Sequence, residues 1–466
     1  MASPSRRNQR PVTTALAVIV AVITDCGAPQ DQASRDPAWS FAADAFIAPY
    51  VSSGNMSGAV LVRRGGGTVY ERLVGRSDPE RGGTVHPATR FRIGSVTKSF
   101  TAAAVLRLRD RGAFALDDPV ERLIPGFPHG DAVTVRHLLS HRSGLGNYYF
   151  LPDFAAFSAR RYERPADVVR SMRTVPLQFR PGARRAYNNI NYTALAWLVE
   201  RVSGVRFADY LRRELLSPLG LDHTGDPPSD VPGGGDDLAG GQEPVGIDST
   251  TRARSTEYSF LVGAGSLAAS AGDVARWLEA VDAGRVVSGQ SRDELIEFAA
   301  LDDEFLGRPA LSTAGWDGMG YSAFALRVPT DSLTVVVLSN VSIAAVPGEI
   351  ARGVAALALD SQPVSAPLAP RALPADSLSL LEGEYRFGND FYVPSGRLVL
   401  VARNGWLLDT GRTPEAALIP LADGEFLYRP TWARVRFLTR EPGVVEGLRF
   451  DGRFVAERMT DETALQ

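Results

Sequence analysis

Lysine is almost missing from this chain of 466 residues. Of its 50 lysine and arginine side chains 49 are arginine, and Lys98 is the single lysine. A guanidinium stays protonated at any relevant pH, whereas a buried amine can lose its proton and act as a base. A lone lysine in a chain that otherwise uses arginine therefore indicates a position whose chemistry arginine cannot supply.

Cysteine, histidine and clustered charge are also scarce. The single cysteine, Cys26, excludes a disulfide framework, and a net charge of −3 without a basic run argues against nucleic acid as a partner. His137 and His141 lie four residues apart, a spacing that can hold a metal on a helix, but no nearby carboxylate completes a ligand set. Gly65–Gly67 fits a hairpin turn better than a phosphate loop. We therefore expect neither a metal nor an organic cofactor.

The N-terminus predicts export. An apolar run, Val12–Ile23, follows three arginines and is too short to span a bilayer, so we assign an export signal to residues 1–26 and a flexible tail to residues 27–37. Cys26 follows the run as in a bacterial lipoprotein signal, although Asp25 stands where a small residue is expected. A lipid on Cys26, which would tether the protein to a membrane, and ordinary secretion are both open. The expected location is periplasmic, anchored to the cell envelope, or secreted.

Ser95 precedes Lys98 by three residues, at the start of an apolar stretch that ends at Gly112. Such a stretch is typical of a helix ended by glycine. Positions i and i+3 lie on one helix face about a turn apart, so the hydroxyl and the amine can meet. This is the Ser-x-x-Lys arrangement of acyl-transfer serine enzymes. The alternative, a solvated lysine near a helix start, is disfavoured because the motif coincides with the only lysine.

The order of strands and helices over residues 38–359 predicts an α+β domain with one antiparallel sheet flanked by helices. The expected strands are Gly58–Arg63, Thr68–Val74, Met319–Val328 and Leu333–Leu338. The expected helices are Ser40–Tyr50, the stretch after Ser95, Tyr192–Val202, Phe207–Leu216, Val274–Val281 with Asp273 as its N-cap, and Ile350–Leu359.

A proline-rich linker is expected at residues 360–376, and the chain changes character beyond it. Residues 377–466 contain short alternating runs separated by turn signals, which predict a small all-β barrel, closed to remove edge strands. The expected strands are Arg397–Arg403, Trp406–Thr410, Phe426–Arg429, Ala433–Arg440, Gly447–Phe450 and Arg453–Met459.

A second motif, Tyr187-x-Asn189, stands just before a predicted helix. Alone it fits a loop tyrosine and an N-cap asparagine. Together with Ser95-x-x-Lys98, the run His137–Leu145 and the run Gly263–Ser270, it resembles the serine β-lactamase-related family over about residues 38–359. That family includes class C β-lactamases, D-Ala-D-Ala carboxypeptidases, D-aminopeptidases and related esterases. The C-terminal β module resembles the lipocalin-like domain that accompanies some members.

The resemblance implies roles for four residues. Ser95 would be the acylated nucleophile, and Lys98 would be neutral, or share its proton, when it activates that serine. Tyr187 would act as base or relay, and would later protonate the leaving group and activate water. Asn189 would hydrogen-bond the substrate carbonyl. The backbone N–H of Ser95, at a helix N-terminus, suits an oxyanion donor.

The third family motif departs from its pattern. The resemblance leads us to expect Lys-Thr-Gly, or a His-x-Gly variant, on a strand facing the site. Here Thr313 replaces the cationic residue, Gly315 is retained, and the Trp316 N–H would be the second oxyanion donor. Loss of the cation removes the usual handle for a substrate carboxylate, so uncharged esters or amides are favoured as substrates. An arginine from elsewhere in the chain is the alternative handle.

These features predict an exported serine hydrolase that forms an acyl-enzyme on Ser95 with a small-molecule ester, amide or peptide. The alternatives are a β-lactamase, a D-Ala-D-Ala carboxypeptidase or D-aminopeptidase, and a non-catalytic binding or sensor protein of the same fold. A binder has no need of the proton-transfer set Ser95, Lys98 and Tyr187. The β module can shape the active-site mouth, mediate self-association or bind an apolar ligand, and the sequence leaves these roles and the oligomeric state open.

Overall fold

The computed structural model describes residues 37–80, 82–226, 237–254, 257–363, 372–388, 390–391, 395–441 and 443–459. The predicted export signal with Cys26, nearly all of the predicted tail and part of the proline-rich linker lie outside these ranges.

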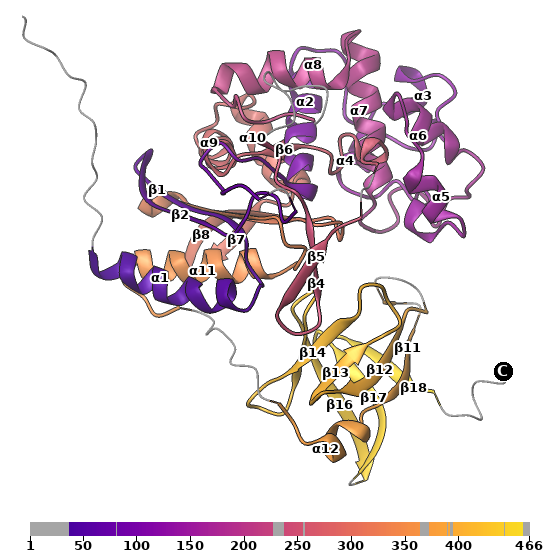
Figure 1. Cartoon of the computed structure of the whole chain (residues 1–466). Helices are drawn as coiled ribbons and strands as arrows, with labels where there is room; N and C mark the ends of the chain where they lie inside the picture. The colour runs from indigo at the N-terminus through magenta and orange to yellow at the C-terminus, as the bar shows by residue number, and fades with distance from the viewer. Residues whose placement is uncertain are drawn as a thin grey trace, which may run out of the picture.

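A six-stranded antiparallel sheet forms the centre of the first part of the described chain, in the order β2-β1-β10-β9-β8-β7 (Figure 1). Strands β1 and β10, which come from opposite ends of this part of the chain, lie side by side in the sheet and pair along their whole length. Helices cover both faces of the sheet (Figure 1). The predicted α+β class is confirmed. The strands are β1 (Gly58–Arg64), β2 (Gly67–Val74), β7 (Asp302–Phe305), β8 (Arg308–Trp316), β9 (Ser322–Val328) and β10 (Leu333–Ser339).

Strand β10 shows why this sheet needs two covering layers. All of its residues are buried, as expected for a continuous apolar run with both faces packed. Val336 and Leu338 belong to the core under the helical layer. Val335 and Val337 belong to a second core, shared with α1 (Pro37–Ser52) and α11 (Val346–Ala358) on the opposite face. The sheet therefore separates two hydrophobic cores.

Helices α2 (Thr97–Asp110) and α7 (Asn189–Ser203) pack against each other within the larger helical layer. Both are buried over most of their length, which fixes the two helix starts relative to each other. The surrounding helices are α3 (Val120–Leu123), α4 (Val135–Leu139), α5 (Phe154–Ala159), α6 (Pro165–Ser171), α8 (Phe207–Leu211), α9 (Ala271–Asp282) and α10 (Gly289–Phe298).

Two predicted element starts were wrong for local reasons. The N-cap of α9 is Ser270, whose Oγ accepts the Asp273 N–H, so Asp273 lies inside the first turn. Its carboxylate instead accepts hydrogen bonds from His223 and Thr224. Strand β9 begins at Ser322 rather than at Met319, because the preceding residues form a turn held by the carboxylate of Asp317.

The C-terminal part of the described chain is a closed antiparallel barrel, as predicted, with β11 pairing back to β18. Sequence patterns missed β11 and β14, since β14 is fully buried and lacks alternation. Aromatic side chains fill the interior, and Leu378 of the short helix α12 (Ala375–Ser379) joins them. The strands are β11 (Gly383–Phe387), β12 (Arg397–Arg403), β13 (Trp406–Asp409), β14 (Ala416–Pro420), β15 (Phe426–Tyr428), β16 (Ala433–Glu441), β17 (Val444–Phe450) and β18 (Phe454–Arg458).

A hairpin that the sequence did not reveal connects the two parts. Its strands β4 (Gln242–Val245) and β5 (Ser249–Arg252) extend from the sheet region to the barrel (Figure 1). At its tip Gly246 forms a bridge to Ala416 of β14. The hairpin belongs to the first part of the chain and is hydrogen-bonded to the barrel, so it links the two.

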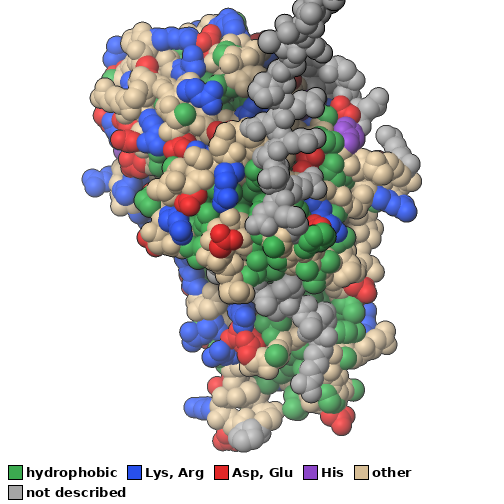
Figure 2. Space-filling view, turned by 90° about the vertical axis from the view of Figure 1, so that its left-hand side faces the viewer, with side chains coloured by type: hydrophobic (Ala, Val, Ile, Leu, Met, Phe, Trp, Pro, Cys, Tyr) green, Lys and Arg blue, Asp and Glu red, His purple; other side chains and the backbone are tan. Residues whose placement is uncertain are grey.

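Helix α1 lies on an outer face of the molecule. It buries Ala43, Ile47 and Tyr50 in the core beneath it and leaves Phe41 71% exposed. Figure 2 shows this side, where charged side chains of both signs gather over the helical layer and hydrophobic ones are prominent around the middle. Within the described ranges, the helices are all too short or too polar to cross a membrane.

Candidate active site

Ser95 lies in the short helix η1 (Gly94–Val96), directly before α2. Gly94 has a φ of +48°, a conformation that favours glycine. A Cβ atom on Gly94 would lie 3.0 Å from the backbone nitrogen of Trp316, and one on Gly315 would lie 3.1 Å from the backbone nitrogen of Ser95. Glycine at both positions therefore lets the end of β8 approach the turn that carries the serine.

Two polar side chains meet at the Ser95 hydroxyl. Lys98 Nζ donates a hydrogen bond to Ser95 Oγ at 3.0 Å, and the Tyr187 hydroxyl lies 2.6 Å from the same oxygen. The Lys98 nitrogen also lies 4.8 Å from the centre of the Tyr187 ring. The structure thus brings together all three residues that sequence reasoning selected as catalytic.

Lys98 is only 5% exposed. Burial lowers the pKa of its amine below the ordinary value, while the nearby Tyr187 side chain acts in the opposite direction. Its second hydrogen-bond acceptor is the carbonyl oxygen of Ala264, at 2.6 Å. Ala264 belongs to the Gly263–Ser270 run, so one task of that run is to hold the lysine nitrogen beside Ser95. A neutral amine in this position can accept the serine proton.

Tyr187 stands before α7 with its side chain 54% exposed. The His141 ring packs against it at 4.7 Å between ring centres, and the Tyr192 ring lies on another side of the histidine at 5.1 Å. Burial, with the charges of Lys98 and Arg185, lowers the pKa of His141 to about 3. Its Nδ1 accepts the N–H of the residue before Asn189. Neutral His141 therefore supports the tyrosine as a packing partner.

Asn189 is the first residue of α7 and is capped by Asn188, whose side chain accepts the Ile190 N–H. The Asn189 Nδ2 donates to the Tyr149 hydroxyl at 3.2 Å. Its buried Oδ1 has no hydrogen-bond partner among the described residues. Burial raises the pKa of Tyr149 to about 12, so its hydroxyl stays protonated. Tyr149 thus reaches the site through its contact with Asn189.

His137 and His141 do not form a helical pair. Helix α4 ends at Leu139, and His141 has a φ of +57° outside it. The His137 side chain closes a capping box with Thr134 at the start of α4. Across the described ranges, histidine, cysteine and carboxylate side chains form no group of three or more that could hold a metal ion.

Comparison with known proteins decides the family. A family model described as Beta-lactamase matches residues 43–360, more than half of the chain. The chain belongs to the beta-lactamase family. The matched segment ends before β11, so the barrel lies outside it.

Relatives in the beta-lactamase family carry different names. Penicillin-binding protein 4* of Bacillus subtilis is 31% identical over 36% of this chain and 37% of its own length. Esterase EstB of Burkholderia gladioli is 38% identical over 35% of this chain and 45% of its own. The chain thus spans less than half of these curated relatives. An octameric penicillin-binding protein homologue from Pyrococcus abyssi has the same fold, with 24% identity and a TM-score of 0.59 over 89% of this chain and 99% of the other.

The third motif of this beta-lactamase family member lies on β8. Thr313 and Gly315 are two residues apart in a strand and therefore share a face, and Thr313 is half-buried. Trp316 ends the strand, remains 44% exposed, and donates its indole N–H to Ser342 Oγ at 2.9 Å. Strand β8 thus brings Gly315 and Trp316 against the serine turn, with Thr313 two residues before Gly315 on the same strand.

A buried network beside Trp316 was missed by sequence reasoning. Asp317 accepts the N–H groups of Met319 and Tyr321 and the hydroxyl of Tyr258, the last at 2.9 Å. Burial raises the pKa of Asp317, and these hydrogen bonds oppose that shift. The Arg92 guanidinium stacks 3.5 Å from the centre of the Tyr258 ring. The network holds the turn after Trp316. The sequence did not predict this role, because an aspartate after the end of a strand is not a motif by itself.

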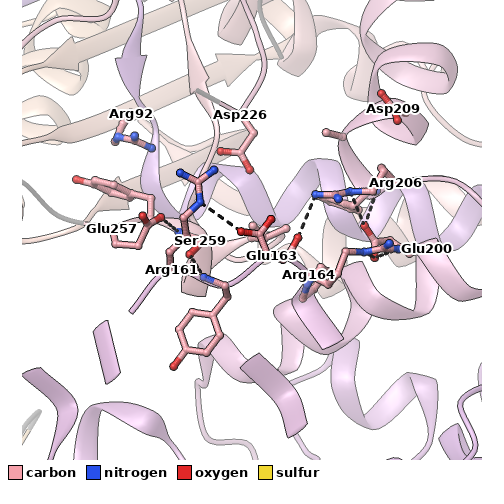
Figure 3. A pocket seen from close by; sticks show the side chains of 16 residues that line it. Arg92, Arg161, Glu163, Arg164, Glu200, Arg206, Asp209, Asp226, Glu257 and Ser259 are labelled. Atoms are coloured by element: carbon pink, nitrogen blue, oxygen red, sulfur yellow. Dashed lines mark hydrogen bonds and ion pairs between the residues drawn. The ribbon is translucent and has the colours of Figure 1, made fainter. Parts of the chain in front are cut away.

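A charged cavity of about 520 Å³ lies next to this network (Figure 3). Arginine and acidic side chains alternate around it, and Figure 3 shows several of them pairing across its floor. Glu200, for example, binds both Arg164 and Arg206. The cavity walls do not include Ser95, Lys98 or Tyr187. The cavity is therefore separate from the Ser95 site, and charged groups such as Glu200 form ion pairs within its wall.

Proposed function

We propose that this protein is an exported serine hydrolase that forms an acyl-enzyme on Ser95 with uncharged esters. The observation that carries the proposal is the contact of one hydroxyl with both Lys98 Nζ, at 3.0 Å, and the Tyr187 hydroxyl, at 2.6 Å. A nucleophile and base within hydrogen-bond reach, with a third group on the same proton path, is the signature of covalent catalysis. Family membership supports the same class, because esterases and penicillin-binding proteins are among its relatives.

The reaction begins with proton transfer from Ser95 Oγ to the neutral amine of Lys98. The serine oxygen attacks the carbonyl carbon, and the backbone N–H groups of Ser95 and Trp316 stabilise the developing oxyanion. Tyr187 then delivers a proton to the leaving group, whose bond to the carbonyl carbon breaks. Water then attacks the acyl-enzyme and gives one proton to the Tyr187 phenolate. The bond between the acyl carbon and Ser95 Oγ breaks, the protonated Lys98 returns its proton to Ser95 Oγ, and the acid leaves.

Uncharged substrates fit the walls of the site. Thr313 offers a hydroxyl where a cation would bind a substrate carboxylate, which removes a charge-assisted hydrogen bond. Tyr187 and Trp316 expose about half of their surface, and Tyr149 lies against Asn189. Aromatic walls with few polar groups are typical of sites for apolar ligands. We therefore propose an apolar acyl group on the substrate.

Two assays test this function. Hydrolysis of p-nitrophenyl esters and of nitrocefin is measured with the same preparation, and the ester is expected to be the better substrate by kcat/KM. A fluorophosphonate probe is expected to label the wild type and not Ser95→Ala. Equal labelling of both proteins contradicts the nucleophile assignment, and labelling without turnover of any substrate favours the binding or sensor alternative.

Amides are the second candidate substrate class, and one observation favours them. The buried Oδ1 of Asn189 is an acceptor without a described partner, and a substrate N–H group would satisfy it. An ester has no such donor. An ester and an anilide with the same acyl group separate the two classes. Asn189→Ala is expected to lower kcat/KM for the anilide more than for the matched ester.

Export is proposed from residues 1–26 and tested separately. Fusion of these residues to a reporter that is active only outside the cytoplasm is expected to give activity. Metabolic labelling with a fatty acid, compared between the wild type and Cys26→Ala, distinguishes a lipid tether from secretion. A reporter that stays in the cytoplasm contradicts the proposal.

A further inference from the structure

Arg429 is a fully buried arginine that joins the barrel to the sheet domain. It stands at the end of β15, yet its guanidinium donates to groups of the other part of the molecule. Burial lowers its pKa to about 10, and its acceptors among the described residues are uncharged. The acceptors are Asn55 Oδ1 and the carbonyl oxygens of Ser53, Gly54, Val245, Gly246 and Ser249.

These contacts attach two separate segments to one side chain. Asn55 and its neighbours follow α1, whereas Val245 and Ser249 belong to the β4–β5 hairpin. A buried guanidinium requires several hydrogen-bond acceptors. Removal of the guanidinium leaves buried carbonyl groups without a donor, and removal of the acceptors leaves the buried guanidinium without partners. The barrel is therefore docked by a polar anchor that both segments must satisfy together.

Pro430, the residue after Arg429, makes the next contact toward the active site. The carbonyl oxygen of Pro430 accepts the N–H of Ala344 at 3.1 Å. The same segment, residues 341–344, pairs with the start of the hairpin, since Gln242 accepts the Ser342 N–H at 2.9 Å. Anchor and hairpin thus hold residues 341–344 from two sides.

That segment in turn holds the end of strand β8. Ser342 Oγ accepts the indole N–H of Trp316 at 2.9 Å. Ser322, the partner of Trp316 in the β8–β9 ladder, donates its hydroxyl to the carbonyl oxygen of Val341 at 2.8 Å. Trp316 is the residue whose backbone nitrogen lies against the serine turn.

We propose that the barrel is a positioning domain: through Arg429, Pro430 and residues 341–344 it fixes Trp316, and with it the oxyanion donor on β8. The interior of the barrel is filled by its own aromatic side chains, among them Tyr385, Phe387 and Phe450. We therefore assign the role of the barrel to the contacts of its outer surface. Arg429, Pro430 and Ser342 are positioning residues, because they act through Trp316 and do not touch the serine. The kinetic part of the proposal rests on the proposed hydrolase function.

Tryptophan emission tests the connection without any substrate. The chain has six tryptophans, so the difference between the wild type and Trp316→Phe isolates the Trp316 signal. Arg429→Met is expected to shift that emission to longer wavelength, because the indole loses its fixed partner and gains water. The same substitution made in the Trp316→Phe protein is expected to give no such shift. A shift of equal size in both backgrounds overturns the proposal.

Kinetics test the consequence for catalysis. A misplaced oxyanion donor lowers kcat and leaves KM largely unchanged, and we expect a fall of about tenfold to hundredfold in Arg429→Met. Ser342→Ala, which removes only the last link, is expected to lower kcat in the same way, and the double variant to lose little more than the larger single loss. Arg434→Met is the matched control, since Arg434 bonds Asp423 and Glu425 within the barrel.

Folding and function failures are distinguishable in this design. Circular dichroism shows whether Arg429→Met folds. If it does not, Ser342→Ala tests whether the chain of contacts fixes Trp316. Normal kcat and unshifted Trp316 emission in Ser342→Ala overturn the proposal. If the wild type hydrolyses no ester, the proposed function fails, while the emission comparison still decides whether the barrel positions Trp316.

Discussion

The Lys98 nitrogen lies 3.0 Å from the Ser95 oxygen inside the protein, and its other bond goes to the backbone carbonyl of Ala264. A lysine held by two oxygens but desolvated by its surroundings has a lowered pKa. The neutral form is therefore present at lower pH than in a free lysine, and the amine can serve as a base where a solvent-exposed lysine is still charged. The predictions below start from this pair.

Ester hydrolysis should rise with pH through the pKa of Lys98 and reach its plateau at lower pH than titration of a free lysine, whose pKa is about 10.4, would give. The sign follows because protonated lysine cannot accept the serine proton. Lys98→Arg, which stays charged, should lower kcat by about 10²–10⁴-fold at every pH. The pH profiles of kcat/KM for both proteins check this. A wild-type profile that still rises at the pH of free lysine would contradict it.

His141 should make the folded protein sensitive to acid. Its pKa is about 3 in the folded state, whereas an unfolded histidine titrates near pH ~6.5, so only the unfolded state binds the proton between these values. The contribution of His141 to the free energy of unfolding is therefore complete above that range and is lost as pH falls, by about 2 kcal/mol at pH ~5. Between neutral pH and pH ~5, the free energy of unfolding of His141→Gln should fall less than that of the wild type. Urea unfolding at the two pH values measures the difference.

Gly315→Ala should damage both stability and catalysis. A Cβ atom there would overlap the carbonyl oxygen of Ile93, so β8 must move away from the serine turn. We expect a loss of about 1–3 kcal/mol in the free energy of unfolding and of about 100-fold in kcat. Gly289→Ala is the control, because a Cβ atom at that helix position meets nothing within 4 Å. Thermal unfolding and ester kinetics of both variants decide the outcome.

Thr313→Lys should change the preferred substrate charge. The ammonium would stand on β8, on the strand face that Gly315 shares, and could bind a substrate carboxylate. Such a hydrogen bond is worth about 1.5–3 kcal/mol, or about 10- to 100-fold in kcat/KM. Nitrocefin turnover should rise by that factor while turnover of a neutral ester changes little. Thr313→Met gives a side chain of similar length without charge, and an equal gain in this variant argues against the electrostatic explanation.

Local patterns predicted helices α2 and α7, which begin at the site, and four strands of the sheet, but not β7 or β8. The helix after Ser95 and the hairpin around Gly65–Gly67 appear with nearly the predicted bounds. Their apolar periodicity and glycine turns are properties of consecutive residues. Two errors, the starts of α9 and β9, occur where a side chain reaches across several residues, Ser270 in the first case and Asp317 in the second. Strand β14 was missed for another reason, because it is buried throughout and lacks alternation.

The sequence by itself determined the spacing that lets one lysine meet one serine on a helix, and the alternation that closes the C-terminal strands into a barrel. Both depend on the regular periods of helix and strand. Only the tertiary structure decided that Tyr149 reaches Asn189, that Ser342 holds Trp316, and that Arg429 docks the barrel. These contacts join residues tens to hundreds of positions apart, and a period within one segment carries no information about which distant segment will pack against it.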